Sequence, residues 1–234
     1  MIDLIAFDAD DTLWINEPRY KSAEAKFRSL LELYAPGDVV SQCLHETELR
    51  NLKILGYGVK GYIISMIETA IEVTNKKISG TEIAEIVRMG KQMMEAPIQL
   101  FEHVEKTLAK LSKTKNLVMI TKGDLVEQED RIARSGIAQY FRHIEIVSEK
   151  TEETYRNLLR KYNVEPKHFM MVGNSMRSDI LPVVALGACA VYIHYEDTWQ
   201  YENAHAHHVE HGSYEQIDHI GLFPELVERI ESRG

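Results

Sequence analysis

Cysteine is scarce in this sequence: the 234 residues include only Cys43 and Cys189, which lie far apart. Neither belongs to a Cys-x-x-Cys pattern. We therefore expect both to be small buried residues of a protein from a reducing compartment, and we expect that compartment to be the cytoplasm.

Long hydrophobic segments are missing as well. No stretch is long enough to span a bilayer, and the first residues, MIDLIAFDAD, have no basic region followed by a long apolar segment. We therefore expect no signal peptide. The composition, 44% hydrophobic and 27% charged, is ordinary for a soluble globular protein with a substantial core.

Excess positive charge is the third absence. The formal net charge is −9, and no basic stripe is visible that could replace the counterions of a nucleic acid. We therefore expect no nucleic-acid partner and no membrane partner. An acidic protein can still bind an anionic substrate if local cations or a bound metal reverse the potential inside one cleft.

Five short apolar runs predict buried parallel strands: LIAF (4–7), NLVMI (116–120), IEIV (144–147), FMMV (169–172) and CAVYI (189–193). Helix-like stretches lie between the later runs, and in 151–162 the residues Tyr155, Leu158, Leu159 and Tyr162 follow helical spacing. This alternation predicts an α/β fold with a doubly wound, Rossmann-like parallel sheet.

The region after the first strand is helical instead. Its four expected helices include one near 20–34, one at 39–55, one beginning near Tyr62 and one opening at 79–82, where Ser79 and Glu82 have capping-box spacing. We therefore expect an α/β core formed by 1–16 and 97–234, with a helical domain inserted at 17–96. Because ligands bind beyond the carboxyl ends of strands in such sheets, the insertion is expected to act as a lid.

Polar residues follow four of the predicted strands, at the point where each strand ends. The carboxyl ends of parallel strands meet at one edge of a sheet, so we expect these side chains to converge there. They are Asp8 and Asp10 after the first strand, Thr121 after the second, Lys150 after the third, and Asn174 and Asp179 after the fourth.

In order and context, these residues resemble the motifs of the haloacid dehalogenase-like superfamily, most of whose members are phosphatases. The motifs are Asp-x-Asp-x-Thr, a Thr or Ser after an apolar strand, a Lys near a helix start, and Gly-Asp-x-x-x-x-Asp. They match, in turn, Asp8, Asp10 and Thr12; Thr121; Lys150; and Gly173 to Asp179, where Asn174 replaces the usual acidic residue.

The resemblance implies a phosphomonoesterase that uses Mg²⁺ and carries a helical cap. Asp8 is then the nucleophile that forms an aspartyl-phosphate, and Asp10 protonates the leaving oxygen and later deprotonates water. A carboxylate that attacks a phosphate is an anion approaching an anion, and Mg²⁺ bridging the two would remove that repulsion. The expected metal ligands are Asp8, the main-chain carbonyl of Asp10, Asn174 and Asp179, although Asp179 could instead hold Asn174 and metal-bound waters.

Four residues are expected to bind the phosphoryl group. Thr121 would donate its hydroxyl and Lys150 a positive charge. Gly123 would let the backbone approach the phosphate, and Lys122 would either add positive potential or be solvated. The adjacent Asp11 is expected to be a solvated turn residue.

Several readings remain open from the sequence. Nucleoside monophosphates are the first substrate candidates and sugar phosphates the second. A 2-haloacid dehalogenase is the main enzymatic alternative, but its chemistry attacks carbon, needs no metal and has no use for Asp10. A phosphoacceptor signalling module is a third, although in receiver domains the phosphorylated Asp ends a different strand from the metal-binding acids. The segment 205–211, with His207 and His211 four residues apart, raises a weaker zinc hypothesis.

Overall fold

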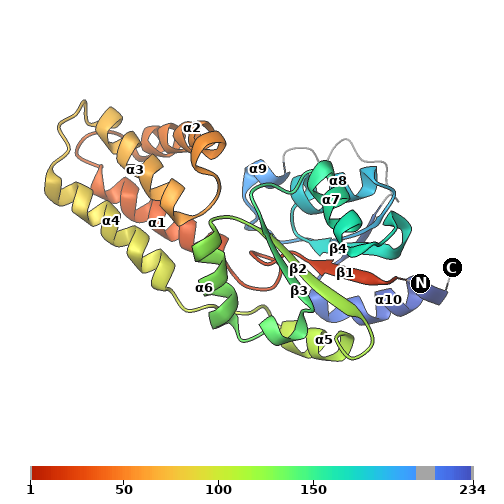
Figure 1. Cartoon of the computed structure of the whole chain (residues 1–234). Coiled ribbons are helices and arrows are strands. Elements are labelled where there is room, and N and C mark those ends of the chain that lie inside the picture. Colours follow the sequence, from red (N-terminus) through yellow and green to blue (C-terminus); the bar gives the residue numbers. More distant parts are fainter. Residues whose placement is uncertain (1, 204–213, 233–234) are drawn as a thin grey trace. The chain divides into compact units, whose positions relative to one another are not determined.

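The computed structural model of the chain describes residues 2–203 and 214–232 (Figure 1). The histidine-rich segment 205–211 lies outside the described residues. The chain divides into two compact units. The first comprises Met1–Glu17, Ile98–Lys122 and Gln128–Gly234, and the second comprises Pro18–Pro97 and Gly123–Glu127. In the described parts of the chain, no helix has the length and apolarity that crossing a membrane requires.

The first unit is built on a six-stranded sheet with the order β3-β2-β1-β4-β5-β6, and all its pairings are parallel. This confirms the predicted doubly wound α/β fold. Five strands coincide with the apolar runs, whereas β6 was not expected because its sequence, EQI, is short and mostly polar. The strands are β1 (Leu4–Phe7), β2 (Asn116–Lys122), β3 (His143–Val147), β4 (Phe169–Gly173), β5 (Cys189–Ile193) and β6 (Glu215–Ile217).

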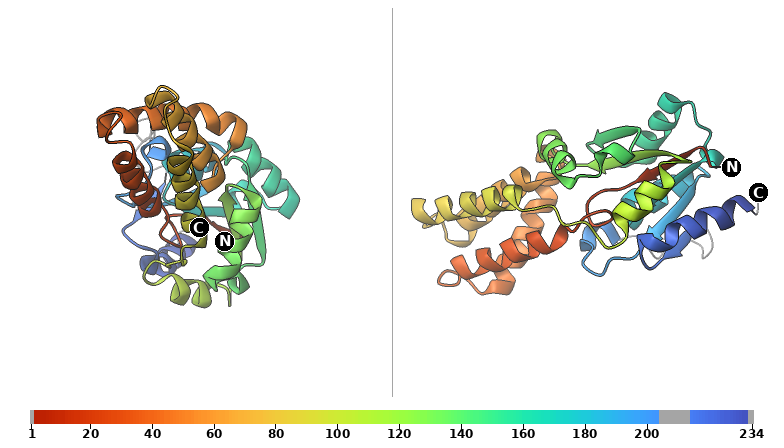
Figure 2. Two further views of the ribbon diagram at one scale, coloured as in Figure 1. Left: turned by 90° about the vertical axis from the view of Figure 1, so that its left-hand side faces the viewer. Right: turned by 90° about the horizontal axis from the view of Figure 1, so that it is seen from below.

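Both faces of this sheet are covered by helices. Leu4 and Ala6 of β1 pack with residues of α7 (Glu152–Tyr162) and α8 (Leu181–Ala185). Ile5 and Phe7 face the other way and pack with α5 (Val104–Leu111) and α10 (Phe223–Ser232), which the right-hand view of Figure 2 shows in front of the sheet. Because helices cover both faces, the two central strands, β1 and β4, are buried along their whole length and consist of apolar residues and one glycine.

The chain reverses direction across the sheet at β1. From β1 it builds β2 and β3 on one side, and then returns to add β4, β5 and β6 on the other. A reversal of strand order of this kind leaves a crevice beyond the carboxyl ends of the two central strands, where ligands of open α/β sheets bind. The residues after β1 and β4 are therefore the ones to examine for a site.

The second unit contains four helices with a core of their own. They are α1 (Glu17–Leu30), α2 (Gly37–Leu55), α3 (Val59–Val73) and α4 (Gly80–Glu95). The capping box predicted for the fourth helix is present, because the Glu82 N–H donates to Ser79 Oγ (3.2 Å) and the Ser79 N–H donates to Glu82 Oε2 (2.7 Å). Phe27, Leu44 and Met66 are among the fully buried side chains of this core.

A short segment outside the expected range 17–96 also belongs to the helical unit. Gly123–Glu127 follows β2 directly and includes the first residues of α6 (Leu125–Ser135). The Val59 N–H donates to Glu127 Oε2 (2.8 Å), and Lys60 Nζ lies 2.8 Å from Asp124 Oδ1. The start of α3 and the start of α6 are therefore joined by one backbone hydrogen bond and one ion pair.

The two cysteines are both free thiols, as expected from the sequence. Cys43 lies on α2 and Cys189 begins β5. Both side chains are partly exposed rather than buried, so the expected degree of burial was wrong.

The close contact between α3 and α4 depends on glycine. A Cβ added at Gly90 would lie 2.4 Å from Ile63 Cγ1 and 2.8 Å from Ile63 Cδ1, whereas a Cβ at Gly80, the first residue of α4, would meet no atom within 4 Å. Ile63 is β-branched and has little rotamer freedom inside a helix. We therefore expect Gly90→Ala to lower the free energy of unfolding by about 1–3 kcal/mol through overpacking.

The control is Gly80→Ala, which adds the same methyl group to the same helix in open space. It should leave the free energy of unfolding unchanged or slightly raised, since alanine favours helix more than glycine does. Urea-induced unfolding followed by circular dichroism measures both variants. Equal stability of the two would show that α3 and α4 do not approach this closely.

Candidate active site

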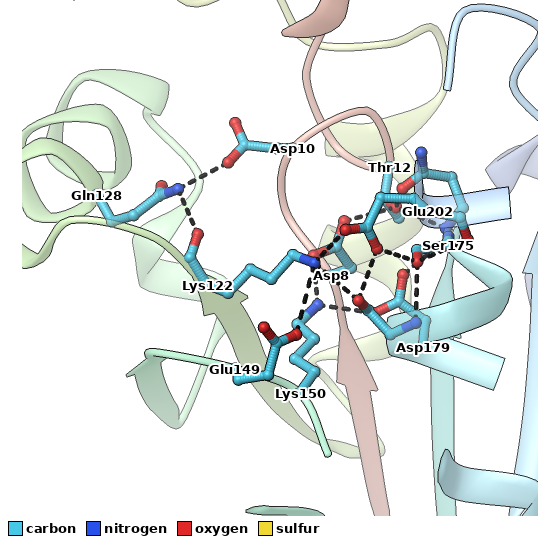
Figure 3. A network of polar contacts seen from close by, with 12 residues as sticks. Asp8, Asp10, Thr12, Lys122, Gln128, Glu149, Lys150, Ser175, Asp179 and Glu202 are labelled. Carbon is cyan, nitrogen blue, oxygen red and sulfur yellow. Dashed lines mark hydrogen bonds and ion pairs between the residues drawn. The ribbon is translucent and has the colours of Figure 1, made fainter. Parts of the chain in front are cut away.

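The centre of the candidate site is a buried lysine between two aspartates. Lys150 Nζ donates to Asp179 Oδ1 (2.7 Å) and also contacts Asp8 Oδ1. The exposed fractions of Asp8, Lys150 and Asp179 are 7%, 2% and 0%, so all three charges are held away from water. Figure 3 shows the three side chains gathered with Thr12, Ser175 and Glu202.

Burial and charge act in opposite directions on these groups. Burial raises the pKa of the Asp8 carboxyl to about 7, against the attraction of Lys150. Burial also opposes the charge on Lys150, but Asp179 and Asp8 outweigh it and raise the pKa of the ammonium group above its ordinary value. Lys150 therefore stays a cation, and a second cation near Asp8 would further favour its carboxylate form.

The register of the strands explains why distant residues meet here. Phe7 of β1 pairs with Met119 of β2 and with Val172 of β4. Two positions further along the three strand directions come Ala9, Thr121 and Asn174. Ala9 lies between Asp8 and Asp10, so the first, second and fourth motifs reach one level of the sheet edge. Lys150 enters from the loop between β3 and α7, where Thr151 caps the helix by accepting a hydrogen bond from the Thr154 N–H (3.2 Å).

Thr12 connects the nucleophile candidate to the fourth motif. Its Oγ lies 2.9 Å from Asp8 Oδ2 and 3.1 Å from Asn174 Oδ1, and it accepts a hydrogen bond from the Asn174 N–H (3.1 Å). Two oxygen atoms of the kind that bind hard cations, one from Asp8 and one from Asn174, are thus held around a single hydroxyl. The other end of the Asn174 amide donates to Thr198 Oγ1 (2.9 Å).

Asp179 lies in a π-helix, Met176–Ile180, in which the N–H groups of Asp179 and Ile180 both donate to the Ser175 carbonyl (2.8 and 3.2 Å). Asp179 Oδ1 accepts from Lys150, and its Oδ2 accepts from the Ser175 N–H (3.0 Å). A Cβ at Gly173 would lie 2.2 Å from Asp179 Oδ2. Only glycine at this position leaves room for the carboxylate to fold back against the end of β4.

Asp10 is held apart from Asp8 by a different set of partners. Its Oδ1 accepts from Trp14 Nε1 and from Arg131 Nη1, both at 2.8 Å, and its Oδ2 accepts from Gln128 Nε2 (2.7 Å). Figure 3 shows the side chain turned toward Gln128 and away from Asp8. Arg131 and Gln128 both come from α6, which follows the second motif directly.

Thr121 is the residue whose surroundings most resemble a binding position. Its side chain is 1% exposed, yet its hydroxyl has no hydrogen-bond partner among the described residues. A buried polar group without a partner costs free energy, so such groups in native proteins commonly await a ligand or water. The orphaned hydroxyl sits at the sheet edge at the level of Ala9 and Asn174, where a phosphoryl oxygen could accept its hydrogen bond.

Lys122 follows Thr121 but faces the opposite side of the strand. Its ammonium group donates to Glu202 Oε1 (2.5 Å) and Ser178 Oγ (2.7 Å), and it lies 4.0 Å from Glu149 Oε1. Glu202 Oε2 accepts in turn from the hydroxyls of Ser175 (2.5 Å) and Ser178 (2.6 Å). The positive charge of Lys122 is thus already paired with a buried carboxylate from the short helix α9 (Gln200–Asn203).

Asp11 differs from the expectation of a solvated turn residue. It is 7% exposed and has a positive φ of 61°. Its carboxylate accepts hydrogen bonds from the N–H groups of Asn16 (2.9 Å) and Glu17 (3.0 Å), where α1 begins. Burial raises the pKa of Asp11 to about 7, against these two hydrogen bonds. Asp11 therefore fixes the loop after β1 instead of contacting solvent.

The structure joins six of the predicted or motif residues in one network: Asp8, Thr12, Lys122, Lys150, Asn174 and Asp179. Thr121 shares the sheet edge, Asp10 is bound separately, and Gly123 (φ 141°) groups with the helical unit. Sequence reasoning missed Gln128, Arg131, Thr198 and Glu202. Arg131 and Gln128 lie on one helix face after the second motif, which is a detectable pattern, whereas nothing near Thr198 or Glu202 marks them.

Comparison with known proteins identifies the family. A sequence model described as haloacid dehalogenase-like hydrolase matches residues 2–187. The chain belongs to this family. The expected resemblance is therefore confirmed, and the protein is a hydrolase of the haloacid dehalogenase-like family.

A haloacid dehalogenase-like family hydrolase from Xanthomonas campestris has a crystal structure similar to this chain. The two are 37% identical with a TM-score of 0.88, over 99% of this chain and 93% of that one. A 2-haloacid dehalogenase from Pseudomonas syringae pv. tomato is 20% identical with a TM-score of 0.64, over 98% and 100% of the two chains. At that identity the likeness shows the fold alone.

A curated relative is a glyceraldehyde 3-phosphate phosphatase from Pyrococcus furiosus. It is 27% identical over 132 residues, which are 54% of this chain and 52% of that protein. The match thus spans only about half the length of the relative. Within the haloacid dehalogenase-like hydrolases, the comparisons therefore include both a dehalogenase and a phosphatase.

Glu202 should make the stability of this hydrolase depend on pH. Burial opposes its charge, but Lys122 and the two serine hydroxyls outweigh burial and lower its pKa below the ordinary value of 4.5. A carboxyl group whose pKa is lower in the folded than in the unfolded protein stabilises the fold at pH values above the unfolded pKa. This stabilisation is lost as the pH falls through the folded pKa. We expect Glu202→Gln to lower the free energy of unfolding at pH 7 by about 2–4 kcal/mol, because Lys122 loses its nearest charged partner.

Urea unfolding of both proteins between pH 7 and pH 3.5 measures the effect. The difference between wild type and Glu202→Gln should shrink as the pH falls below about 4.5, where the unfolded Glu202 takes up a proton. Glu165→Gln is the control, because Glu165 pairs with Lys167 on the exposed surface (side chains 68% and 69% exposed) and its loss should change little. A difference that does not vary with pH would contradict the buried ion pair.

Proposed function

We propose that the protein is a Mg²⁺-dependent phosphomonoesterase that acts on a small phosphorylated metabolite through an aspartyl-phosphate. The observation that carries the proposal is the pair of carboxylates, Asp8 and Asp10, held by separate cations on one loop. Phosphoryl transfer needs a nucleophile and a proton carrier as two groups with different surroundings. Displacement of a halide at carbon needs only the first.

The chemistry divides between the two acids. A carboxylate oxygen of Asp8 forms a bond to phosphorus while the ester P–O bond breaks, and Asp10 gives a proton to the departing alcohol oxygen. A water molecule then attacks the phosphorus of the aspartyl-phosphate and gives its proton to Asp10, which releases phosphate and the free Asp8 carboxylate. Lys150 and the Thr121 hydroxyl would stabilise the phosphoryl oxygens in both steps.

The side chains here fit a small hard cation. Among the described residues no group of three or more His, Cys, Asp and Glu forms a metal site, but Mg²⁺ requires few protein ligands and accepts carbonyl and amide oxygens. Asp8, the main-chain carbonyl of Asp10 and Asn174 Oδ1 would hold it. Mg²⁺ would supply positive charge that offsets the repulsion between Asp8 and the phosphate.

Asp179 has a different part in this proposal. Both of its carboxylate oxygens are already bonded, one to Lys150 and one to the Ser175 N–H. We therefore assign it the task of holding Lys150 and the loop after β4, and we assign the ligand atom to Asn174. Such supporting contacts are commonly as important to a metal site as the ligands themselves.

The substrate is proposed by class. Thr121 and Lys150 would bind the phosphoryl group. The helical unit is proposed to act as a cap that contacts the rest of the substrate. Nucleoside monophosphates and sugar phosphates are the candidates from the sequence. The name of the curated relative, a glyceraldehyde 3-phosphate phosphatase, adds phosphorylated three-carbon aldehydes to the panel.

The test of the activity is phosphate release from a panel of these metabolites by wild type and Asp8→Asn, with Mg²⁺ and with EDTA. We expect release by wild type only when Mg²⁺ is present, and none by Asp8→Asn, since an amide cannot form the acyl-phosphate. Release that survives EDTA or occurs in Asp8→Asn refutes the mechanism. Halide release from 2-haloacids without metal would assign the dehalogenase activity instead.

A separate prediction concerns Asp10. Asp10→Asn should lower kcat by about 10²–10⁴-fold, the usual contribution of a positioned proton carrier. Mg²⁺ affinity and the circular dichroism spectrum should change little, because the main-chain carbonyl remains and an amide still accepts hydrogen bonds from Trp14 and Arg131. Asp130→Asn, at an exposed position of α6, is the control and should retain kcat. Undiminished kcat in Asp10→Asn would remove Asp10 from the mechanism.

A further inference from the structure

Residues of the segment after β5 contact the fourth motif, although none of them belongs to any of the four motifs. Thr198 is 8% exposed, and its Oγ1 accepts a hydrogen bond from Asn174 Nδ2 (2.9 Å). Its backbone is held by a hydrogen bond from the Thr198 N–H to the Tyr195 carbonyl (3.1 Å). Four residues later, Glu202 accepts from Ser175, which follows Asn174, and from Ser178 of the π-helix.

This contact bears on the unusual residue of the motif. A carboxylate at position 174 would present an oxygen atom toward the site in either orientation of its terminal group. An amide has one oxygen and one nitrogen, and only the oxygen binds a hard cation. The torsion that turns the amide has two broad minima, so the side chain itself does not select the useful one.

The neighbours of Asn174 select between these orientations. Thr12 fixes the position of the residue by accepting its N–H, and the Asn174 Oδ1 faces Thr12 Oγ (3.1 Å), which is also 2.9 Å from Asp8 Oδ2. Thr198 engages the nitrogen on the opposite side. With Nδ2 bound there, the oxygen is left on the side of Asp8.

We propose that Thr198 is a positioning residue that turns the Asn174 amide so that its oxygen faces the cation site. The inference rests on the proposed function, because it concerns the Mg²⁺ of that site. A carboxylate at this position would need no such partner, because it presents an oxygen atom in either orientation. The amide needs one, and the hydrogen bond to Thr198 supplies it. It is expected to act on metal affinity and to touch neither substrate nor metal.

The test compares five proteins: wild type, Thr198→Val, Thr198→Ser, Asn174→Asp and the double variant Thr198→Val with Asn174→Asp. Valine keeps the shape of threonine and removes the hydroxyl. Affinity for Mn²⁺, used as a paramagnetic substitute for Mg²⁺, is measured without substrate from the electron paramagnetic resonance signal of free Mn²⁺. Isothermal titration with Mg²⁺ gives a second reading.

Thr198→Val should weaken the affinity of the Asn174 protein by about 10-fold or more, the usual effect of losing a group that orients a metal ligand. In the Asn174→Asp background the same change should weaken it by less than about 3-fold, since either carboxylate oxygen can face the metal. Thr198→Ser keeps the hydroxyl and should retain the wild-type affinity, which also shows that the segment tolerates substitution.

Three results would overturn the proposal. Equal weakening in both backgrounds would mean that Thr198 only supports the loop, and unchanged affinity in Thr198→Val would mean that Thr12 alone orients the amide. Weakened affinity in Thr198→Ser would show that the hydroxyl is not the operative group. If wild type binds neither Mn²⁺ nor Mg²⁺, the metal-dependent function fails together with this inference, whereas the first three results leave that function standing.

Discussion

The buried contact of Lys150 with Asp8 and Asp179 is the interaction on which the rest of the site depends. An ammonium group and two carboxylates cannot be removed from water unless each finds a charged partner. Their partners come from three separate parts of the chain: the end of β1, the loop before α7 and the π-helix after β4. The parallel register of β1 with β2 and β4 brings these parts together, and Gly173 leaves the space that Asp179 occupies.

Two further ion pairs lie around this centre, and each neutralises a different carboxylate. Arg131 binds Asp10, and Lys122 binds Glu202. The two acids on the first loop are therefore neutralised by different cations, Lys150 for Asp8 and Arg131 for Asp10. This separation gives the two carboxylates different surroundings, as the roles of nucleophile and proton carrier require.

The sequence predicted those features that depend on local patterns. The apolar runs located five of the strands, and the Ser79 and Glu82 spacing located the start of α4. Lys150 and Asn174 were found because each follows an apolar strand, and a polar residue at that point lies at the carboxyl edge of the sheet. Thr198 and Glu202 could not be found in this way, since their contacts join residues 24 or more positions apart. Thr198 precedes α9, and Glu202 lies in α9, which at four residues is too short to show a periodic pattern.

Asp11 was expected to be solvated, and this was wrong for a related reason. Its carboxylate is held by the N–H groups of Asn16 and Glu17, which need an acceptor where α1 begins, and the sequence around Asp11 does not reveal these contacts. The strand β6 was missed because its residues are paired by the sheet edge and not by their own preference for extended structure. Tertiary contacts decided both cases.

The amide at position 174 is understandable once the charges of the network are counted. Apart from the partly exposed Glu149, four carboxylates, those of Asp8, Asp10, Asp179 and Glu202, meet three cations, Lys150, Arg131 and Lys122. A fifth carboxylate beside Asp8 would double the excess negative charge in a region shielded from water, where repulsion is strong. Asparagine avoids that repulsion, but it attracts a cation less strongly and offers it a single oxygen. The surrounding structure therefore has to fix the direction in which the amide oxygen points.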